Sequence, residues 1–92
     1  HTVETGEFLQ SELRTLAKKY SFVKEVRGIG LMVGMPLSIP AADIVRKGHE
    51  RGLLLNAVHD TVLRFVPPLI VTKQEIMQMI TLLDGIFAEV RE

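Results

Sequence analysis

Residues 29–37, which read IGLMVGMPL, decide the fold class of this chain. Every second residue of the stretch is large and apolar: Ile29, Leu31, Val33, Met35 and Leu37. Because successive side chains of a β-strand point to opposite faces, this alternation predicts a strand with one face in a core. Between these positions stand Gly30, Met32 and Gly34. A face this bare lets another backbone or a helix approach closely.

The segments before this stretch predict a helix and a further strand. Apolar residues recur at helical spacing over residues 3–20, although Gly6 weakens the first turn. Residues 21–27 contain Phe22, Val23 and Val26, and we expect a strand there. Gly28 lies between the two expected strands and suits a tight turn.

The segments after it predict a helix, two short strands and a final helix. Residues 40–51 form the helix, with Pro40 in the first turn and Gly52 as the C-terminal cap, and Gly48 weakens it by about 1 kcal/mol relative to alanine. Residues 53–58 and 61–66 are the strands, joined through His59-Asp60 and stopped by Pro67-Pro68.

The last helix carries the clearest local signal. Thr72 and Glu75 have the spacing of a capping box, and an apolar stripe continues from Ile76 to Val90. The order helix, two strands, helix, two strands, helix predicts an α+β fold. We expect two layers, with three helices on a mainly antiparallel sheet of about four short strands, in a single domain covering residues 1–92.

Composition excludes several classes of protein. Eleven basic and 11 acidic side chains give a net charge of zero, so the one-sided positive field of a nucleic-acid surface is absent. The chain has no cysteine, which is compatible with the cytoplasm and excludes disulfides and thiolate metal sites. It has no apolar run of the roughly 20 residues that a membrane span needs. It begins at His1 and enters a helical pattern almost at once, which indicates a piece of a longer chain or the loss of a short leader.

Most candidate motifs carry no chemistry. Gly28-Ile29-Gly30 lacks the third glycine and the following helix of a phosphate loop. The three histidines, His1, His49 and His59, lack metal-ligand spacing, and no serine stands in a nucleophile elbow. No lysine lies in an apolar context that would lower its pKa for Schiff-base chemistry.

Arg64 is the one unusual residue. It stands within the apolar run Val62-Leu63-Arg64-Phe65-Val66. Because an unpaired buried charge is very costly, its guanidinium must reach water, a carboxylate partner or a ligand. The residues alone leave two interpretations open: an edge or ion-paired structural arginine, or an arginine that grips a ligand carboxylate with its planar fork.

Two stretches resemble a known family. Residues 23–34, VKEVRGIGLMVG, resemble the V-x-x-V-R-G-x-G-L-M-x-G segment of class III aminotransferases. Residues 51–56, RGLLLN, with residues 62–71, VLRFVPPLIV, resemble the R-G-L-L-x-N and L-R-F-x-P-P-L-x-V segments of the acetylornithine and ornithine type. With the terminal helix, the resemblance covers essentially the whole chain.

The resemblance implies a C-terminal small domain of a pyridoxal-phosphate-dependent enzyme. The Schiff-base lysine and the cofactor-binding residues would then lie in a large domain outside these 92 residues, so this segment would bind no cofactor and be inactive alone. Arg64 corresponds to the family's substrate-carboxylate arginine, while Asn56 and His59 are candidates to line the same cleft. The expected reaction is amino transfer between N-acetylornithine and 2-oxoglutarate in arginine biosynthesis, by a cytoplasmic homodimer. Gly48 departs from the family, whose members usually carry a better helix former there.

Other functions stay open at this point. The parent enzyme could act on ornithine or on another ω-amino substrate, such as 4-aminobutyrate or succinylornithine. The chain could also be a free-standing α+β anion-binding or regulatory module, with Arg64 gripping the anion.

Overall fold

The computed structural model describes residues 2–53, 55–65 and 71–91. Its elements are α1 (Thr2–Ala17), β1 (Arg27–Ile29), β2 (Met32–Pro36), α2 (Ala42–Glu50), β3 (Asn56–Val58), β4 (Val62–Phe65) and α3 (Lys73–Val90). The four strands form one antiparallel sheet in the order β1-β2-β4-β3. This arrangement confirms the predicted α+β fold with three helices.

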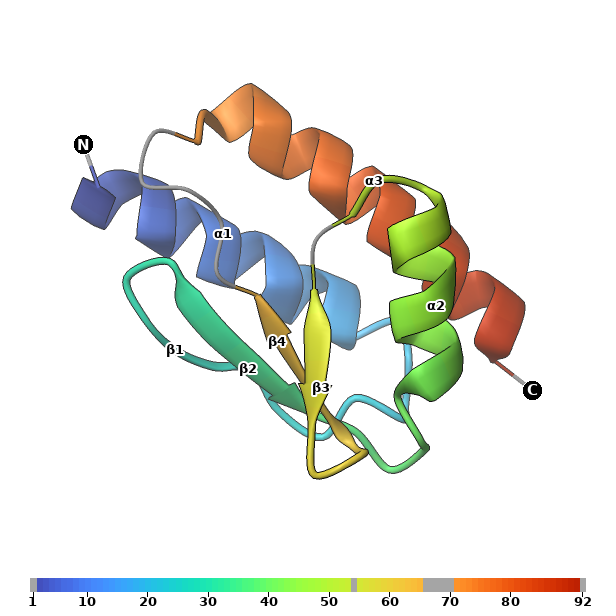
Figure 1. Ribbon diagram of the computed structural model, residues 1–92. Helices are drawn as coiled ribbons and strands as arrows, with labels where there is room; N and C mark the ends of the chain where they lie inside the picture. Colours follow the sequence, from blue (N-terminus) through green and yellow to red (C-terminus); the bar gives the residue numbers. More distant parts are fainter. Residues whose placement is uncertain (1, 54, 66–70, 92) are drawn as a thin grey trace.

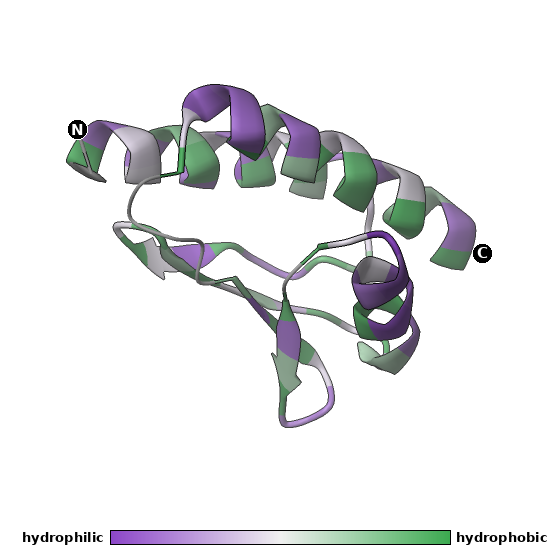
Figure 2. Ribbon diagram, turned by 45° about the horizontal axis from the view of Figure 1, so that its top comes forward, coloured by the Kyte–Doolittle hydropathy of each residue, from purple (hydrophilic) through white to green (hydrophobic). Residues whose placement is uncertain are grey.

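The helices and the sheet form two layers. Helices α1 and α3 lie side by side over one face of the sheet, and α2 lies beside α3 at one end (Figures 1 and 2). The alternating residues of β2 and β4 supply the sheet side of the core: Val33, Met35, Leu63 and Phe65, each at most 2% exposed. No described helix covers the opposite face, which therefore remains open.

The first hairpin differs from the prediction. Residues 21–26 contribute only an isolated bridge from Val23 to Leu37, and β1 begins at Arg27. The expected strand over 21–27 is wrong because Phe22 and Val23 are both buried, which period two does not allow. The Phe22 ring packs in the core, with its centroid 5.2 Å from that of Phe87.

The hairpin turn lies at Gly30-Leu31 rather than at Gly28. Ile29 pairs with Met32, and Gly30 has the positive φ (59°) that a tight two-residue hairpin turn requires. A Cβ atom at Gly6 would lie 2.6 Å from the carbonyl carbon of Gly30, so α1 touches the turn backbone to backbone. This contact involves the turn and not the bare face: Met32 of that face is 63% exposed, so the predicted close approach to it is not found among the described residues.

Helix α2 is shorter than predicted but ends where expected. The Leu53 amide donates to the Gly48 carbonyl (2.7 Å) and the Gly52 amide to the His49 carbonyl (3.3 Å). These two bonds, with the positive φ of Gly52 (82°), form a Schellman cap. Gly48 is buried, and a Cβ atom there would lie 3.3 Å from Leu55 Cδ2, so the glycine gives the Leu55 side chain its room.

The second hairpin and α3 follow the prediction closely. Strands β3 and β4 are shorter than expected, and the turn between them holds His59 and Asp60 at positive φ (55° and 65°). The proposed strand stop at Pro67-Pro68 lies outside the described residues. The capping box is confirmed: the Glu75 amide donates to Thr72 Oγ1 (3.1 Å), and the Thr72 amide donates to Glu75 Oε1 (2.9 Å).

Candidate functional site

Arg64 lies in β4 between two core residues. Leu63 and Phe65 point into the core, whereas Arg64 is exposed on the open face of the sheet. Its guanidinium therefore reaches water, and the burial of a charge is avoided. Among the residues that the structure describes, none forms an ion pair or a side-chain hydrogen bond with it. The structural ion pair that the sequence left open is thus not found in the described part of the chain.

Four residues form a row across the sheet at the level of Arg64. Arg27 pairs with Gly34, Gly34 pairs with Arg64, and Arg64 pairs with Asn56. Directly opposed residues of an antiparallel sheet project from the same face. The two arginines therefore stand on the open face about 9–10 Å apart at their Cα atoms, which is twice the spacing between neighbouring strands. Gly34 leaves a gap between them.

A shallow depression of about 460 Å³ follows this row. It is lined by Arg27, Met32, Val33, Gly34, Pro36, Val58, His59, Val62, Arg64 and Phe65. The lining holds two guanidinium groups, one imidazole and an apolar floor, and contains no carboxylate. It therefore has the composition of an anion site, although the chain as a whole has no net charge.

Of the two other predicted site residues, His59 lines this depression and Asn56 does not. His59 lines it from the turn between β3 and β4, so the structure brings His59 and Arg64 together. Asn56 is exposed beside Arg64 in the row, but it does not line the depression.

Arg27 is the residue that sequence reasoning missed. The sequence places it at the end of the expected strand over residues 21–27, and a turn at Gly28 would set it opposite the residues just after that turn and far from Gly34. A turn at Gly30-Leu31 would have paired it with Gly34. Its guanidinium donates to Glu25 Oε1 (2.7 Å) and Oε2 (3.0 Å), which lowers the pKa of the Glu25 carboxyl. Because both partners are exposed, this ion pair is weak and can exchange for another anion.

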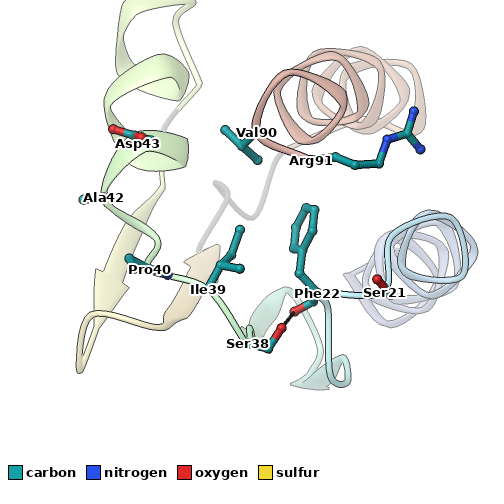
Figure 3. Close-up of a pocket in the computed structure, with 9 residues that line it drawn as sticks. All are labelled: Ser21, Phe22, Ser38, Ile39, Pro40, Ala42, Asp43, Val90 and Arg91. Carbon is teal, nitrogen blue, oxygen red and sulfur yellow. Dashed lines mark hydrogen bonds between the residues drawn. The ribbon is translucent and has the colours of Figure 1, made fainter.

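A larger cleft, of about 720 Å³, lies between the start of α2, the end of α3 and the segments that hold Phe22 and Ser38 (Figure 3). Phe22, Ile39 and Val90 point into it, and the Arg91 guanidinium points away. The Ser38 hydroxyl donates weakly to the Phe22 carbonyl (3.4 Å), and no histidine lies in the lining to activate a serine. The cleft has room for a ligand, but its lining contains neither a histidine nor a lysine.

A charged cluster joins the end of α1 to α3. The Lys19 ammonium donates to Asp84 Oδ2 (2.7 Å), and the Tyr20 hydroxyl donates to Asp84 Oδ1. These bonds, Lys19 first, hold the pKa of the Asp84 carboxyl below its ordinary value, while burial raises the pKa of the Tyr20 phenol. The cluster lines neither of the two cavities described above, and its hydrogen bonds connect the end of α1 to α3.

Two further site classes find no support in the described residues. No group of three or more histidine, aspartate or glutamate side chains there could hold a metal ion. No helix there is long and apolar enough to cross a membrane.

The profile of the family described as aminotransferase class-III matches residues 1–87 of the chain. The chain belongs to the class III aminotransferases. It is 49% identical to the acetylornithine aminotransferase of Methanocaldococcus jannaschii over 90 residues, or 98% of this chain and 23% of that protein. It is 39% identical to the ornithine aminotransferase of Staphylococcus epidermidis over 87 residues, or 95% of this chain and 22% of that protein.

The solved structures agree with this assignment. The ornithine aminotransferase of Toxoplasma gondii superposes with a TM-score of 0.84 at 30% identity, over 97% of this chain and 22% of that chain. The present chain thus spans less than a quarter of the length of these class III aminotransferases.

Class III aminotransferases use pyridoxal phosphate, which they hold on a lysine, and no lysine in the described part of this chain is buried. Four of its five lysines are exposed, and the half-buried Lys47 is ion-paired with Glu89 (3.0 Å). None is enclosed in a pocket that would keep a Schiff base from water. No step of the chemistry is therefore assigned to a lysine of this chain.

Proposed function

We propose that residues 1–92 are the C-terminal small domain of an acetylornithine aminotransferase. The whole enzyme would transfer an amino group between N-acetylornithine and 2-oxoglutarate, and the part outside these residues would hold pyridoxal phosphate and its lysine. In this proposal Arg64 binds the α-carboxylate of the substrate. The observation that supports it is a guanidinium without a described partner on the open face of the sheet, within the family's Leu-Arg-Phe segment.

The chemistry of Arg64 suits this role. A guanidinium is planar and always charged, and its fork donates two parallel hydrogen bonds to one carboxylate. Strand β4 fixes the backbone of Arg64 between β2 and β3, so the side chain starts from a rigid base. The amino donor and 2-oxoglutarate both carry an α-carboxylate, and the same arginine would hold each of them in turn.

The choice of donor rests on similarity. The chain is 49% identical to an acetylornithine aminotransferase and 39% identical to an ornithine aminotransferase. We therefore propose N-acetylornithine as the donor ahead of ornithine. The proposal extends to a homodimer in the cytoplasm, with the large cofactor-binding domain as the direct partner of this one.

Substitution of Arg64 in the full-length enzyme tests the role. Removal of one partner from a desolvated charge pair costs about 2–5 kcal/mol, which corresponds to a roughly 30-fold to several-thousand-fold loss. Arg64→Ala should lower kcat/KM by this amount for both the amino donor and 2-oxoglutarate. Arg64→Lys should restore only part, because an ammonium lacks the fork. The cofactor absorbance should not change.

Arg46→Ala is the matched control. Arg46 is an exposed arginine of α2 whose ion pairs, with Asp43 and Glu50, lie on the surface. Its removal should leave kcat/KM within about twofold of wild type. If Arg64→Ala behaved like this control, Arg64 would have no role in substrate binding. Comparison of N-acetylornithine with ornithine on the same preparation decides the donor.

A further inference from the structure

Five of the seven glycines have a local reason in the fold. Gly30 and Gly52 adopt positive φ, whereas a Cβ atom at Gly6, Gly28 or Gly48 would come within 2.6, 2.9 or 3.3 Å of a neighbouring atom, respectively. The other two, Gly34 and Gly85, have no positive φ and no close neighbour, and of these only Gly34 lies in the sheet. A Cβ atom at Gly34 would lie 3.9 Å from Leu63 O and from Val62 Cγ1, which is an ordinary contact distance. Neither the backbone nor the described packing requires a glycine at this position.

A glycine without a structural reason is unfavourable inside a strand. It loses more conformational freedom on folding than other residues and has no side chain to pack against its neighbours. Gly34 lies in the middle of β2, between β1 and β4, where a larger residue would pack on both sides. Folding therefore does not explain why a glycine, with no side chain above it, occupies position 34.

The position of that volume supplies the reason. Gly34 is the direct neighbour of Arg64 in the row and separates it from Arg27, and all three line the same depression. A side chain at residue 34 would project from the open face into the gap between the two guanidinium groups. This gap is the space that a carboxylate needs in order to approach the Arg64 guanidinium from the side of β2.

We infer that Gly34 determines which carboxylates reach Arg64, because its missing side chain leaves the seat that the α-carboxylate of the substrate occupies. This inference rests on the proposed function and adds a second residue to it. The ligand is the α-carboxylate of an amino acid or a 2-oxo acid. Arg27 stands on the far side of the same gap, and it would add positive charge there once its exposed ion pair with Glu25 exchanged for the substrate carboxylate.

Graded substitution of Gly34 in the full-length enzyme tests the inference. Gly34→Val should raise KM for both carboxylate substrates and lower kcat/KM by about 10-fold or more, and Gly34→Ala should have a smaller effect in the same direction. The thermal unfolding midpoint should stay within about 3 °C of wild type, because the fold has room for either side chain. Gly85→Ala is the control, since Gly85 of α3 is exposed and a Cβ atom there has no described atom within 4 Å.

A double substitution separates this inference from the proposed function. In the Arg64→Ala enzyme the carboxylate is no longer held, so adding Gly34→Val should change kcat/KM by less than about threefold.

Four outcomes would overturn the inference or the proposed function. If Gly34→Val lowers kcat/KM by the same factor with Arg64 absent as with it present, the carboxylate does not bind beside Gly34. If Arg64→Ala lowers kcat/KM and Gly34→Val leaves it unchanged, the inference fails and the proposed function stands. If Arg64→Ala has no effect, both fail. A marked fall in the unfolding midpoint of Gly34→Val would show that the fold itself needs the glycine, which also overturns the inference.

Discussion

Gly6→Ala should destabilise the domain even though alanine is the better helix former. A Cβ atom at residue 6 would lie 2.6 Å from the carbonyl carbon of Gly30, 2.7 Å from its oxygen and 2.8 Å from its Cα. Carbon atoms pack at about 3.5–4.0 Å, so α1 and the β1–β2 turn would have to separate by about 1 Å. These are backbone atoms and cannot rotate out of the way. The movement would also lengthen the 2.8 Å hydrogen bond that Gln10 Nε2 donates to the Gly30 carbonyl.

The size of the effect follows from three contributions. Overpacking costs about 1–3 kcal/mol, and the lost hydrogen bond costs about 1 kcal/mol. The helix propensity of alanine returns about 1 kcal/mol. The net loss is about 1–3 kcal/mol, and a loss near 2 kcal/mol would lower the unfolding midpoint of a domain of this size by about 10 °C.

Circular dichroism of the 92-residue chain, followed through heating and urea unfolding, measures this change. The chain should unfold cooperatively on its own, because it has its own core and helix caps. Gly85→Ala is the matched control: it is the same substitution inside α3, but with no described atom within 4 Å of the new Cβ, and it should stabilise the chain by up to about 1 kcal/mol. If both substitutions stabilised the chain equally, the contact between Gly6 and Gly30 would have no energetic importance.

Three further predictions concern the same chain. Because hydrogen bonds from Lys19 and Tyr20 lower the pKa of Asp84, its contribution to stability is complete above the ordinary value of 3.8 and is lost as the pH falls through the lower folded-state value. Asp84→Asn should therefore flatten the acid side of a plot of urea midpoint against pH, and an unchanged slope would contradict this. Thr72→Ala should cost about 0.5–2 kcal/mol in urea unfolding through loss of the capping box with Glu75, and a neutral result would mean that the cap adds nothing. Mixed with equimolar pyridoxal phosphate and then borohydride, the isolated chain should give no stoichiometric adduct by mass spectrometry, since no lysine is enclosed; labelling of a single lysine would disprove that.

The sequence predicted those features that depend on neighbours along the chain. The α3 capping box, the glycine cap of α2 and the core face of β2 follow from spacing and backbone preference, and the structure confirms each of them. The same alternation placed Ile29 in the core, which is wrong: Ile29 lies before the turn and is 88% exposed. The prediction from sequence was wrong between residues 21 and 28. Phe22 and Val23 are apolar and adjacent, which suits a strand on local grounds, but the Phe22 ring packs against the rings of Tyr20 and Phe87 in the core.

Arg64 could be recognised from the sequence because it stands in an apolar run and in a family motif. Which residues lie beside Arg64 could be known only from the pairing of the strands in the sheet. Arg27, Gly34 and Arg64 are separated by at least seven residues along the chain, and they meet only because two antiparallel pairings bring them into one register. A one-residue change in a turn moves every side chain of a strand to the other face, so the position of the turn at Gly30 decides which residues stand beside Arg64. Local preference allows a turn at either Gly28 or Gly30, and the contact of Gly30 with α1, 24 positions away at Gly6, selects between them.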